Sequence, residues 1–359
     1  APPPRADHAS RARAARTMAG LNRRTINTLK FLVGAAGAVA LPVAGFAYFT
    51  GETDPLRILG ICFLTWFVAT SAYELFRCYV LPPKDPKSYG DWCIITGSTS
   101  GIGAEFATQM AAKGLNLLLI SRCEEKLAVQ SEKLRAMFRV QIQTMAFDFK
   151  KVNEMDAFYQ RLEGVLPTLE GGIGILINNV GIANEVPYDF EEMDKTWCKE
   201  IMDVNLYSQV FMTKAVMPFM KARKKGLILS VSSSSCTHAT PMLTLYSATK
   251  SFMMQFSRSL AVELKEHGID VQVLIPYYVV SNLFKSRQHT AVAPMTDIYV
   301  RSCMRQLGKD MPVFKGWWAH WVLGKMFIYG GKFGTQQMHR IMKRNRRRYE
   351  ERKAKSKDE

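Results

Sequence analysis

Between residues 91 and 275 the chain alternates short apolar runs with longer stretches of helical character, and this alternation restricts the fold more than any other feature. The apolar runs are DWCIIT, LNLLLIS, VQIQTMAF, GILINN, GLILSVS and DVQVLIP. Strands and helices that alternate at this pace are typical of βαβ units, which build a parallel sheet covered by helices. We therefore predict an α/β fold with a doubly wound parallel sheet.

The first apolar run leads directly into TGSTSGIG, residues 96–103, which contains Gly97, Gly101 and Gly103. A glycine-rich turn between a strand and a helix lets backbone N–H groups and the helix N-terminus approach a phosphate. Tight turns also collect glycine, and the spacing differs from GxGxxG. Because this turn opens the α/β region, it favours a dinucleotide site and a Rossmann-like sheet.

The second apolar run ends at Ser121, which Arg122 follows. A site for NAD usually carries an acid near this point, where it binds the ribose 2′-hydroxyl. An arginine instead suits a 2′-phosphate, because guanidinium binds phosphate oxygens as a charged, bidentate donor. Arg122 therefore indicates NADPH or NADP+, and a solvated arginine at the end of a strand is the alternative interpretation.

The stretch TLYSATKSF places Tyr246 four residues before Lys250, so a helix would bring both side chains to one face. Reduction of a carbonyl needs a proton for the developing alkoxide, and a tyrosine can donate it when a nearby positive charge lowers the tyrosine pKa. Ser233 follows the fifth apolar run, and its hydroxyl can orient a substrate oxygen. It stands in a run of four serines, residues 232–235, and composition does not choose among them. An ordinary surface turn of helix is the alternative for the tyrosine and lysine.

These features together resemble the short-chain dehydrogenase/reductase family. The resemblance covers roughly residues 88–290 and rests on the stretches TGSTSGIG, NNVG, DVNLYS, VSS and YSATK. It implies that Ser233 is the catalytic serine, that Tyr246 is the acid and base, and that Lys250 is the partner of the tyrosine. It also implies that Asn205 holds a water in the proton relay.

The resemblance further implies which residues bind the dinucleotide cofactor. Asp148, at the end of the third strand, would meet the adenine, and Asn179 would support the fourth strand and the cofactor ribose. Val279 and Ser281 would meet the carboxamide. The complete expected set is Gly97, Ser100, Gly101, Ile102, Gly103, Arg122, Asp148, Asn179, Tyr246, Lys250, Val279 and Ser281. The sequence predicts no metal site.

Within this family the chain looks most like the very-long-chain 3-oxoacyl-CoA reductases of the endoplasmic reticulum, which resemble the 17β-hydroxysteroid dehydrogenase type 12 group. The similarity rests on SYGDWCIITGSTSGIG, LLLISRCEEKL, IGILINNVG, TLYSATKSF and VLIPYYVV. It implies NADPH-dependent reduction of 3-oxoacyl-CoA to 3-hydroxyacyl-CoA in fatty-acid elongation, with Ser233 also contacting the substrate. Two departures stand out. SSCTHAT replaces a Gly-Ser-Gly-like turn beside the substrate, which leaves the acyl length open, and Ser281 stands where threonine is common.

Other functions compete with this one. The same chemistry on a steroid, a retinoid or 3-ketosphinganine would use the same residues. A membrane scaffold subunit would keep the fold without turnover, but the intact set of Asn205, Ser233, Tyr246 and Lys250 argues against that reading.

The charge of the chain is concentrated at its ends. The formal net charge is +17, and residues 1–30 and 340–359 together carry +12 of it. A nucleic-acid-binding surface would be basic more evenly, so we expect no nucleic-acid partner. Basic ends beside apolar segments instead fit a membrane-associated protein. The seven cysteines have no paired or metal-ligand spacing, which suggests a reducing compartment.

Two apolar runs, residues 31–49 and 58–73, precede the α/β region. Lysine and arginine concentrate before the first run and after the second, so the positive-inside rule predicts a transmembrane hairpin with both flanks in the cytosol. Two buried helices of a soluble protein are the alternative. Residues 81–90 contain three prolines and are predicted to form a linker.

The C-terminus adds two signals of location. A tryptophan-rich stretch at residues 313–331 fits an interfacial membrane contact, a substrate lid or ordinary core packing. The final residues KSKDE fit a dilysine retrieval signal of the endoplasmic reticulum, or are simply part of a basic tail. The arginine-rich start can also be read as a transit peptide. We expect an endoplasmic reticulum membrane protein whose catalytic domain faces the cytosol.

The sequence thus predicts an ordered set of segments and partners. The expected partners are an acyl-CoA lipid substrate, the membrane and other fatty-acid elongation enzymes, and a homodimer is a candidate oligomeric state. The predicted segments are a basic segment 1–30, a membrane anchor 31–80 of one or two helices, a linker 81–90, a catalytic domain 91–295, a substrate or membrane contact region 296–335 and a basic tail 336–359.

Overall fold

The computed structural model describes residues 54–281 and 289–355. The chain divides into two compact units, residues 1–74 and 75–359. The described part of the first unit is helix α3 (Pro55–Leu75), which exposes large apolar side chains such as Phe63 and Trp66. Within the described ranges, no helix is both long enough and apolar enough to cross a membrane. The predicted apolar run 31–49 lies outside the described residues.

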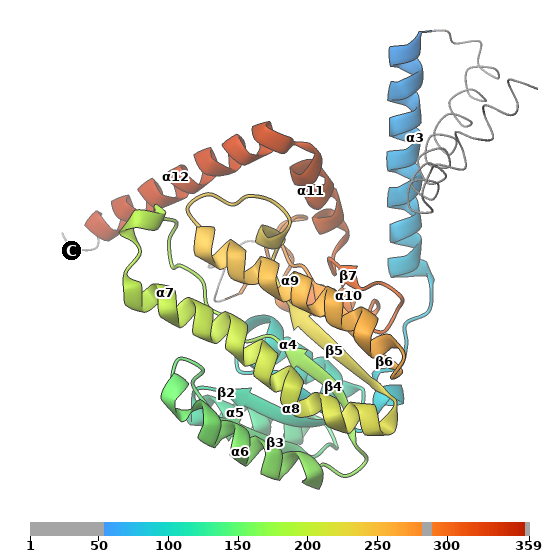
Figure 1. The fold of residues 1–359 in the computed structure, drawn as a ribbon, viewed down its shortest axis with the longest axis vertical. Helices are drawn as coiled ribbons and strands as arrows, with labels where there is room; N and C mark the ends of the chain where they lie inside the picture. Colours follow the sequence, from blue (N-terminus) through green and yellow to red (C-terminus); the bar gives the residue numbers. More distant parts are fainter. Residues whose placement is uncertain (1–53, 282–288, 356–359) are drawn as a thin grey trace, which may run out of the picture. The chain divides into compact units, whose positions relative to one another are not determined.

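The second unit is built on one parallel sheet, in the strand order β3-β2-β1-β4-β5-β6-β7 (Figure 1). The predicted doubly wound parallel sheet is therefore confirmed, and each of the six predicted apolar runs overlaps a strand. A seventh short strand continues the sheet beyond β6. The strands are β1 (Trp92–Thr96), β2 (Asn116–Ser121), β3 (Ile142–Ala146), β4 (Ile173–Asn178), β5 (Gly226–Val231), β6 (Ile269–Leu274) and β7 (Val313–Phe314).

Helices cover both faces of this sheet. On one face, α4 (Gly101–Ala112), α5 (Glu124–Met137) and α10 (Thr296–Met304) pack against the strands. The opposite face is covered by three other helices, which Figure 1 shows in front of the strands. These are α6 (Met155–Val165), α8 (Ser208–Arg223) and α9 (Thr244–Lys265).

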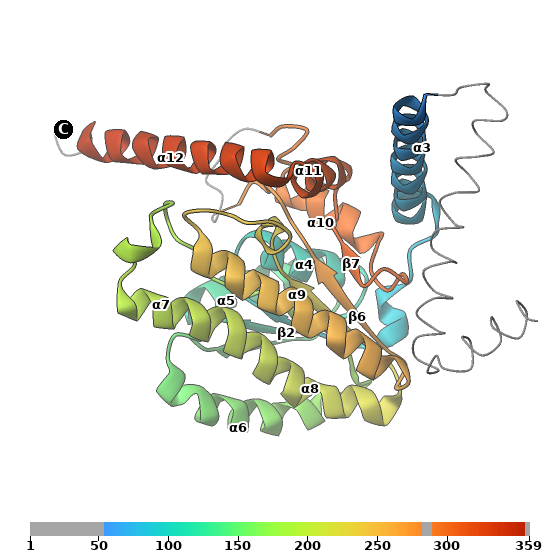
Figure 2. The same cartoon turned by 45° about the horizontal axis from the view of Figure 1, so that its top comes forward.

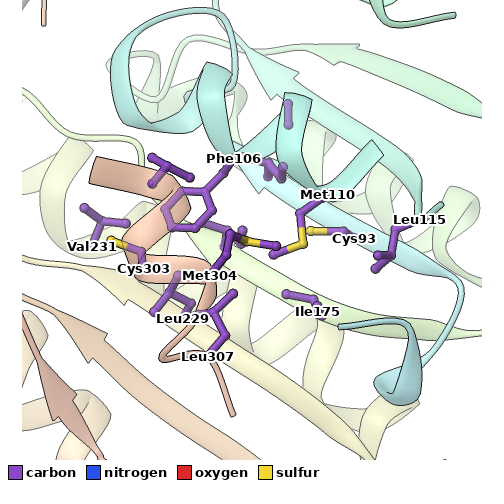
Figure 3. Packing of buried hydrophobic residues seen from close by; sticks show 14 of the residues in the cluster. Cys93, Phe106, Met110, Leu115, Ile175, Leu229, Val231, Cys303, Met304 and Leu307 are labelled. Carbon is purple, nitrogen blue, oxygen red and sulfur yellow. The ribbon is translucent and has the colours of Figure 1, made fainter. Parts of the chain in front are cut away.

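The core explains why the strands read as continuous apolar runs. Successive residues of β1 point to opposite faces, yet Cys93 and Ile94 are both fully buried. Cys93 belongs to the cluster under α4 and α10, part of which Figure 3 shows around Phe106, Met110 and Cys303. Ile94 belongs to the cluster on the other face. Strands of parallel sheets are buried on both sides, so they lose the alternation of polar and apolar residues.

The order of the strands also locates the site. The chain proceeds outward from β1 through β2 to β3, and then returns to the other side of β1 with β4. Ligands of open α/β sheets bind at such a reversal, outside the carboxyl ends of the strands. Helices α7 (Lys195–Met202), α11 (Trp318–Tyr329) and α12 (Gly331–Lys355) complete the unit. Figure 2 shows α11 and α12 on the same side of the unit, beyond α9 and α10.

Candidate active site

The glycine turn lies between β1 and α4, as predicted. Gly97 and Gly101 have φ angles of 63° and 56°, a backbone conformation that favours glycine because it has no Cβ. A Cβ on Gly103 would overlap the side-chain amide nitrogen of Asn179 and the carbonyl oxygen of Gly97. Ser100 is the N-cap residue of α4. The turn therefore opens the N-terminus of a helix at the edge of the sheet, where backbone N–H groups can bind phosphate.

Asn179 fixes this turn from the neighbouring strand β4. Its side-chain amide donates to the carbonyl oxygens of Thr96 and Gly97, both at 3.1 Å. The Thr96 hydroxyl accepts in return from the backbone N–H of Asn179 at 3.0 Å and from that of Val180 at 3.1 Å. Asn179 thus joins the end of the fourth strand to the turn. The reciprocal role of Thr96 was not predicted.

The end of β2 presents a basic side chain beside the same turn. Arg122 is exposed, and within the described residues its guanidinium has no hydrogen-bond or ion-pair partner. The Thr99 and Ser121 hydroxyls hydrogen-bond at 2.8 Å and join the turn to β2. A cavity of about 660 Å³ begins at Thr99 and Gly101 and runs between α4 and α5. Lys126 lines this cavity, and no motif in the sequence marks it as a site residue.

The third strand ends close to its predicted cofactor residue. Asp148 follows β3, and its carboxylate accepts a hydrogen bond from the backbone N–H of Lys150 at 3.1 Å. Val279 follows β6 and is buried. A Cβ on Gly101 would lie 3.5 Å from the Cβ of Ser281, so the chain after β6 returns to the phosphate turn. Residue Ile102 packs against the core beneath the same turn.

Tyr246 and Lys250 lie one turn apart on α9, and both are buried. The ammonium nitrogen of Lys250 lies 5.8 Å from the centre of the tyrosine ring and donates to the carbonyl oxygen of Val231 at 3.1 Å. Burial lowers the pKa of Lys250 to about 8, and the nearby Cys236 opposes this shift. The predicted pairing on one helix face is therefore present in the structure.

The pKa of Tyr246 differs from the sequence-based expectation. Burial raises this pKa, and the Ser233 side chain offsets the rise in part. We expected Lys250 to lower it. The lysine ammonium instead lies against the tyrosine ring and bonds to Val231, and desolvation of the phenol is the larger effect.

The structure distinguishes the four serines after β5. The Ser232 hydroxyl is buried and donates to the carbonyl oxygen of Lys250 at 2.8 Å. The Ser235 hydroxyl is buried without a partner among the described residues. The Ser233 hydroxyl accepts from the backbone N–H of Ser235 at 3.3 Å. Its side chain also hydrogen-bonds the Tyr246 phenol, which lowers the pKa of that phenol. Ser233 is thus the serine placed beside the tyrosine.

Asn205 lies in a π-helical turn (Asp203–Tyr207) between α7 and α8, and it is fully buried. Its side-chain oxygen accepts from the backbone N–H of Ile182 at 2.8 Å, and its amide donates to the Ile182 carbonyl and to Thr249, both at 3.0 Å. The Thr249 hydroxyl in turn donates to the carbonyl oxygen of Tyr246 at 2.8 Å. π-helical turns are frequent at functional sites. Asn205 therefore connects the loop after β4 to the helix that carries the tyrosine.

Gly181 brings the asparagine and the lysine together. A Cβ at this position would lie 3.1 Å from the Lys250 ammonium nitrogen and 3.2 Å from the Asn205 side-chain oxygen. Any larger residue would separate the two groups or fill the space between them. This glycine ends the NNVG motif, and its role does not follow from the sequence alone.

The arrangement unites two functions at one edge of the sheet. The glycine turn and the N-terminus of α4 form a backbone cradle that a side chain on Gly103 would fill, so these residues fit a dinucleotide phosphate. A hydroxyl, a phenol and an ammonium lie close together after β5 and on α9, and they belong to Ser233, Tyr246 and Lys250. Among the described residues, no group of three or more His, Cys, Asp or Glu side chains could hold a metal ion.

The family model for short chain dehydrogenases matches residues 91–291. The chain is 36% identical over 255 residues to the very-long-chain 3-oxoacyl-CoA reductase of Podospora anserina, across 68% of this chain and 74% of that protein. It is 35% identical over 295 residues to the rat enzyme of the same name, across 80% of this chain and 89% of that protein. The human enzyme is 34% identical over 292 residues, with the same coverage.

Solved structures of related fold cover a smaller part of the chain. A short-chain dehydrogenase from Sphingobium yanoikuyae, in complex with NADPH, matches with a TM-score of 0.56 and 24% identity over 62% of this chain and 87% of that chain. A 7β-hydroxysteroid dehydrogenase matches with a TM-score of 0.62 and 19% identity over 72% of this chain and 99% of that chain. At these identities the similarity concerns the fold alone.

Proposed function

The chain belongs to the short-chain dehydrogenase family, and from this premise we propose that it reduces 3-oxoacyl-CoA to 3-hydroxyacyl-CoA with NADPH in the elongation of very-long-chain fatty acids. The observation that carries the proposal is the similarity to several proteins named very-long-chain 3-oxoacyl-CoA reductase, which in two of them extends over 80% of this chain. That extent includes Ser233, Tyr246 and Lys250 in one site.

The chain's own residues account for the proton side of this reduction. When bound, the nicotinamide cofactor supplies the hydride for the carbonyl carbon. Tyr246 donates its phenolic proton to the oxygen as negative charge develops there, and Ser233 hydrogen-bonds the same oxygen and orients it. Burial raises the pKa of the phenol, so the tyrosine is protonated and ready to act as the acid at neutral pH.

Lys250 is suited to hold a proton close to this acid. Its pKa of about 8 allows the buried ammonium to exchange a proton near neutral pH. Gly181 leaves the Lys250 ammonium and the Asn205 side chain adjacent to one small space. A water in that space, with Asn205 as its second partner, would return a proton to Lys250 after the ammonium has given one up to replace the proton lost by Tyr246.

Arg122, which follows β2, would select NADPH over NADH. Arg122 is exposed beside the glycine turn, and its guanidinium has no hydrogen-bond or ion-pair partner within the described residues. A 2′-phosphate on the adenine ribose would satisfy it as a bidentate partner. Lys126 lines the adjoining cavity and can add a second positive charge.

We further propose that the protein resides in the endoplasmic reticulum membrane with its catalytic unit in the cytosol. The support is the concentration of basic residues on either side of the apolar runs 31–49 and 58–73. The basic residues within 340–359 agree with a position beside an anionic membrane surface. Other enzymes of fatty-acid elongation would then be its neighbours in the membrane.

Turnover by the full-length chain tests the proposed reaction. The purified protein is given NADPH and a panel of 3-oxoacyl-CoA substrates of increasing length, with a steroid ketone and a retinal as competing substrates. We expect oxidation of NADPH with 3-oxoacyl-CoA, and loss of it in Tyr246→Phe. Efficient turnover of the steroid or retinal alone would overturn the acyl-CoA assignment. An absence of turnover with every substrate, while NADPH still binds, would favour a scaffold.

A further inference from the structure

Helices α11 and α12 pack on the catalytic unit through one face each. On α11, Phe327 stacks on the His238 ring at a centroid distance of 4.8 Å. Gly324 on the same helix is buried, and a Cβ there would lie 3.0 Å from the Tyr277 hydroxyl. On α12, Met338 and Met342 are buried against Met242. The inner faces of both helices therefore pack against the loop that precedes Tyr246 and against the chain after β6.

An ion pair anchors the distal half of α12. The Arg346 guanidinium donates to both carboxylate oxygens of Glu192, at 2.6 and 2.9 Å. It also donates to Glu350, one turn further along the helix, at 2.8 Å. Bidentate pairs of this kind fix orientation as well as distance. Together with the buried Met338 and Met342, this ion pair sets which face of the helix is directed away from the unit.

That outer face carries large apolar side chains where the chain turns from α11 into α12. Trp318 is 45% exposed, Met326 is 64% exposed and Phe333 is 68% exposed. Val322 and Tyr329 are about half exposed and follow the same helical spacing of three to four residues. Single exposed apolar residues are ordinary, but a continuous row of them marks an interaction surface.

Basic residues continue the same face along α12. Arg340, Arg344 and Arg347 are exposed on the side opposite Met338 and Met342. Residues 317–355 contain eleven lysines and arginines and only two acids. Figure 2 shows that the two helices carrying these rows, α11 and α12, lie on one side of the unit.

We propose that this outer face of α11 and α12 rests on the surface of a lipid bilayer that contains anionic lipids. Tryptophan, tyrosine and phenylalanine side chains would enter the boundary between headgroups and acyl chains, and the arginines of α12 would bind headgroup phosphates. Because the inner faces are packed on the catalytic unit, the helices lie along the bilayer and do not enter it deeply. This contact is separate from any attachment through residues 31–80.

The contact has a consequence that rests on the proposed function. The loop next to Tyr246 carries Met242 and His238, and it packs directly against these two helices. A bilayer on their outer face would lie one helix diameter, roughly 10 Å, from that loop. An acyl chain dissolved in that bilayer would then need only a short path to the tyrosine.

The test places a fluorescent probe on the full-length chain, reconstituted in vesicles. In a background where the partly exposed Cys62, Cys123 and Cys198 are replaced by serine, a polarity-sensitive probe is attached at Met326→Cys. The matched control carries the probe at Val262→Cys, a position that is 78% exposed on α9. Both proteins are measured in phosphatidylcholine vesicles with and without phosphatidylserine, and with acyl chains that bear a quencher.

We expect the probe at 326 to shift to shorter emission wavelength and to be quenched at least about twofold more than the probe at 262. Phosphatidylserine should increase that quenching, and Arg344→Glu should return it to the level of neutral vesicles. Arg161→Glu, an exposed charge reversal on α6, should leave it unchanged. Equal quenching at 326 and 262 would overturn the proposal. Quenching at 326 that ignores both phosphatidylserine and Arg344→Glu would overturn the role of the basic row. The readout needs no turnover, so its outcome is independent of the proposed reaction.

Discussion

Replacing Lys250 by methionine should make the protein more stable at neutral pH while it removes most of the activity. The lysine pKa falls from 10.5 to about 8 because its ammonium is buried. A shift of this size corresponds to about 3 kcal/mol of unfavourable free energy in the folded state when the lysine is charged. Methionine has a similar shape and no charge, so it removes this cost.

The pH dependence gives the prediction its sign. Between pH 8 and pH 10.5 the unfolded chain still binds the lysine proton while the folded chain has released it, so the parent protein gains stability as pH rises through this window. The methionine variant lacks that gain. It also loses the hydrogen bond to Val231, worth about 1 kcal/mol. We therefore expect Lys250→Met to be more stable than the parent by about 2 kcal/mol at pH 7, and less stable above pH 10.5.

Urea unfolding of both proteins across this pH range measures the difference. Lys265→Met is the control, because Lys265 is exposed near the end of the same helix. Its stability should run parallel to that of the parent at every pH. If Lys250→Met also runs parallel to the parent, the lysine is not desolvated as the structure indicates, and the argument for its depressed pKa fails.

Three further substitutions test the site. Tyr246→Phe should lower turnover by about two to four orders of magnitude with cofactor affinity retained. The control is Tyr159→Phe, which removes a buried hydroxyl that has no partner among the described residues. This control should keep its turnover and be at least as stable as the parent protein. Near-parental turnover in Tyr246→Phe would refute the proton donor. Arg122→Asp should raise the KM for NADPH and reduce discrimination against NADH, and unchanged NADPH kinetics would exclude a role for that charge. Gly103→Ala should weaken cofactor binding by about 5- to 100-fold, because the new Cβ meets the fixed carbonyl of Gly97. In the control Gly164→Ala the new Cβ meets nothing within 4 Å, so this variant should bind the cofactor normally. Titration of NADPH fluorescence compares the two variants.

Much of the fold could be predicted from local sequence signals. The apolar runs predicted the positions of β1 to β6, because strands buried on both faces must be apolar throughout. The glycines at 97 and 101 predicted the phosphate turn, because their positive φ angles are a local requirement of the backbone. Tyr246 and Lys250 share a helix face for an equally local reason, the helical repeat. The short strand β7 gave no such signal, because two residues carry no periodicity.

Other features arose only when distant segments met. Ser233 is distinguished within the run of four serines only by tertiary contacts. The Ser232 hydroxyl is bonded to the carbonyl oxygen of Lys250, and the Ser233 side chain reaches the Tyr246 phenol. The raised pKa of Tyr246 and the lowered pKa of Lys250 come from burial under the packed chain, whereas the sequence shows only their spacing.

The outer face of α11 and α12 is the clearest case. The sequence by itself determined that residues 313–359 are rich in tryptophan and basic side chains, but it left core packing, a lid and a membrane contact open. Tertiary structure decided which side chains are exposed, because Phe327 stacks on His238 and Arg346 binds Glu192 across the fold. Local periodicity defines the faces of a helix, and only contacts with the rest of the chain determine which face is buried.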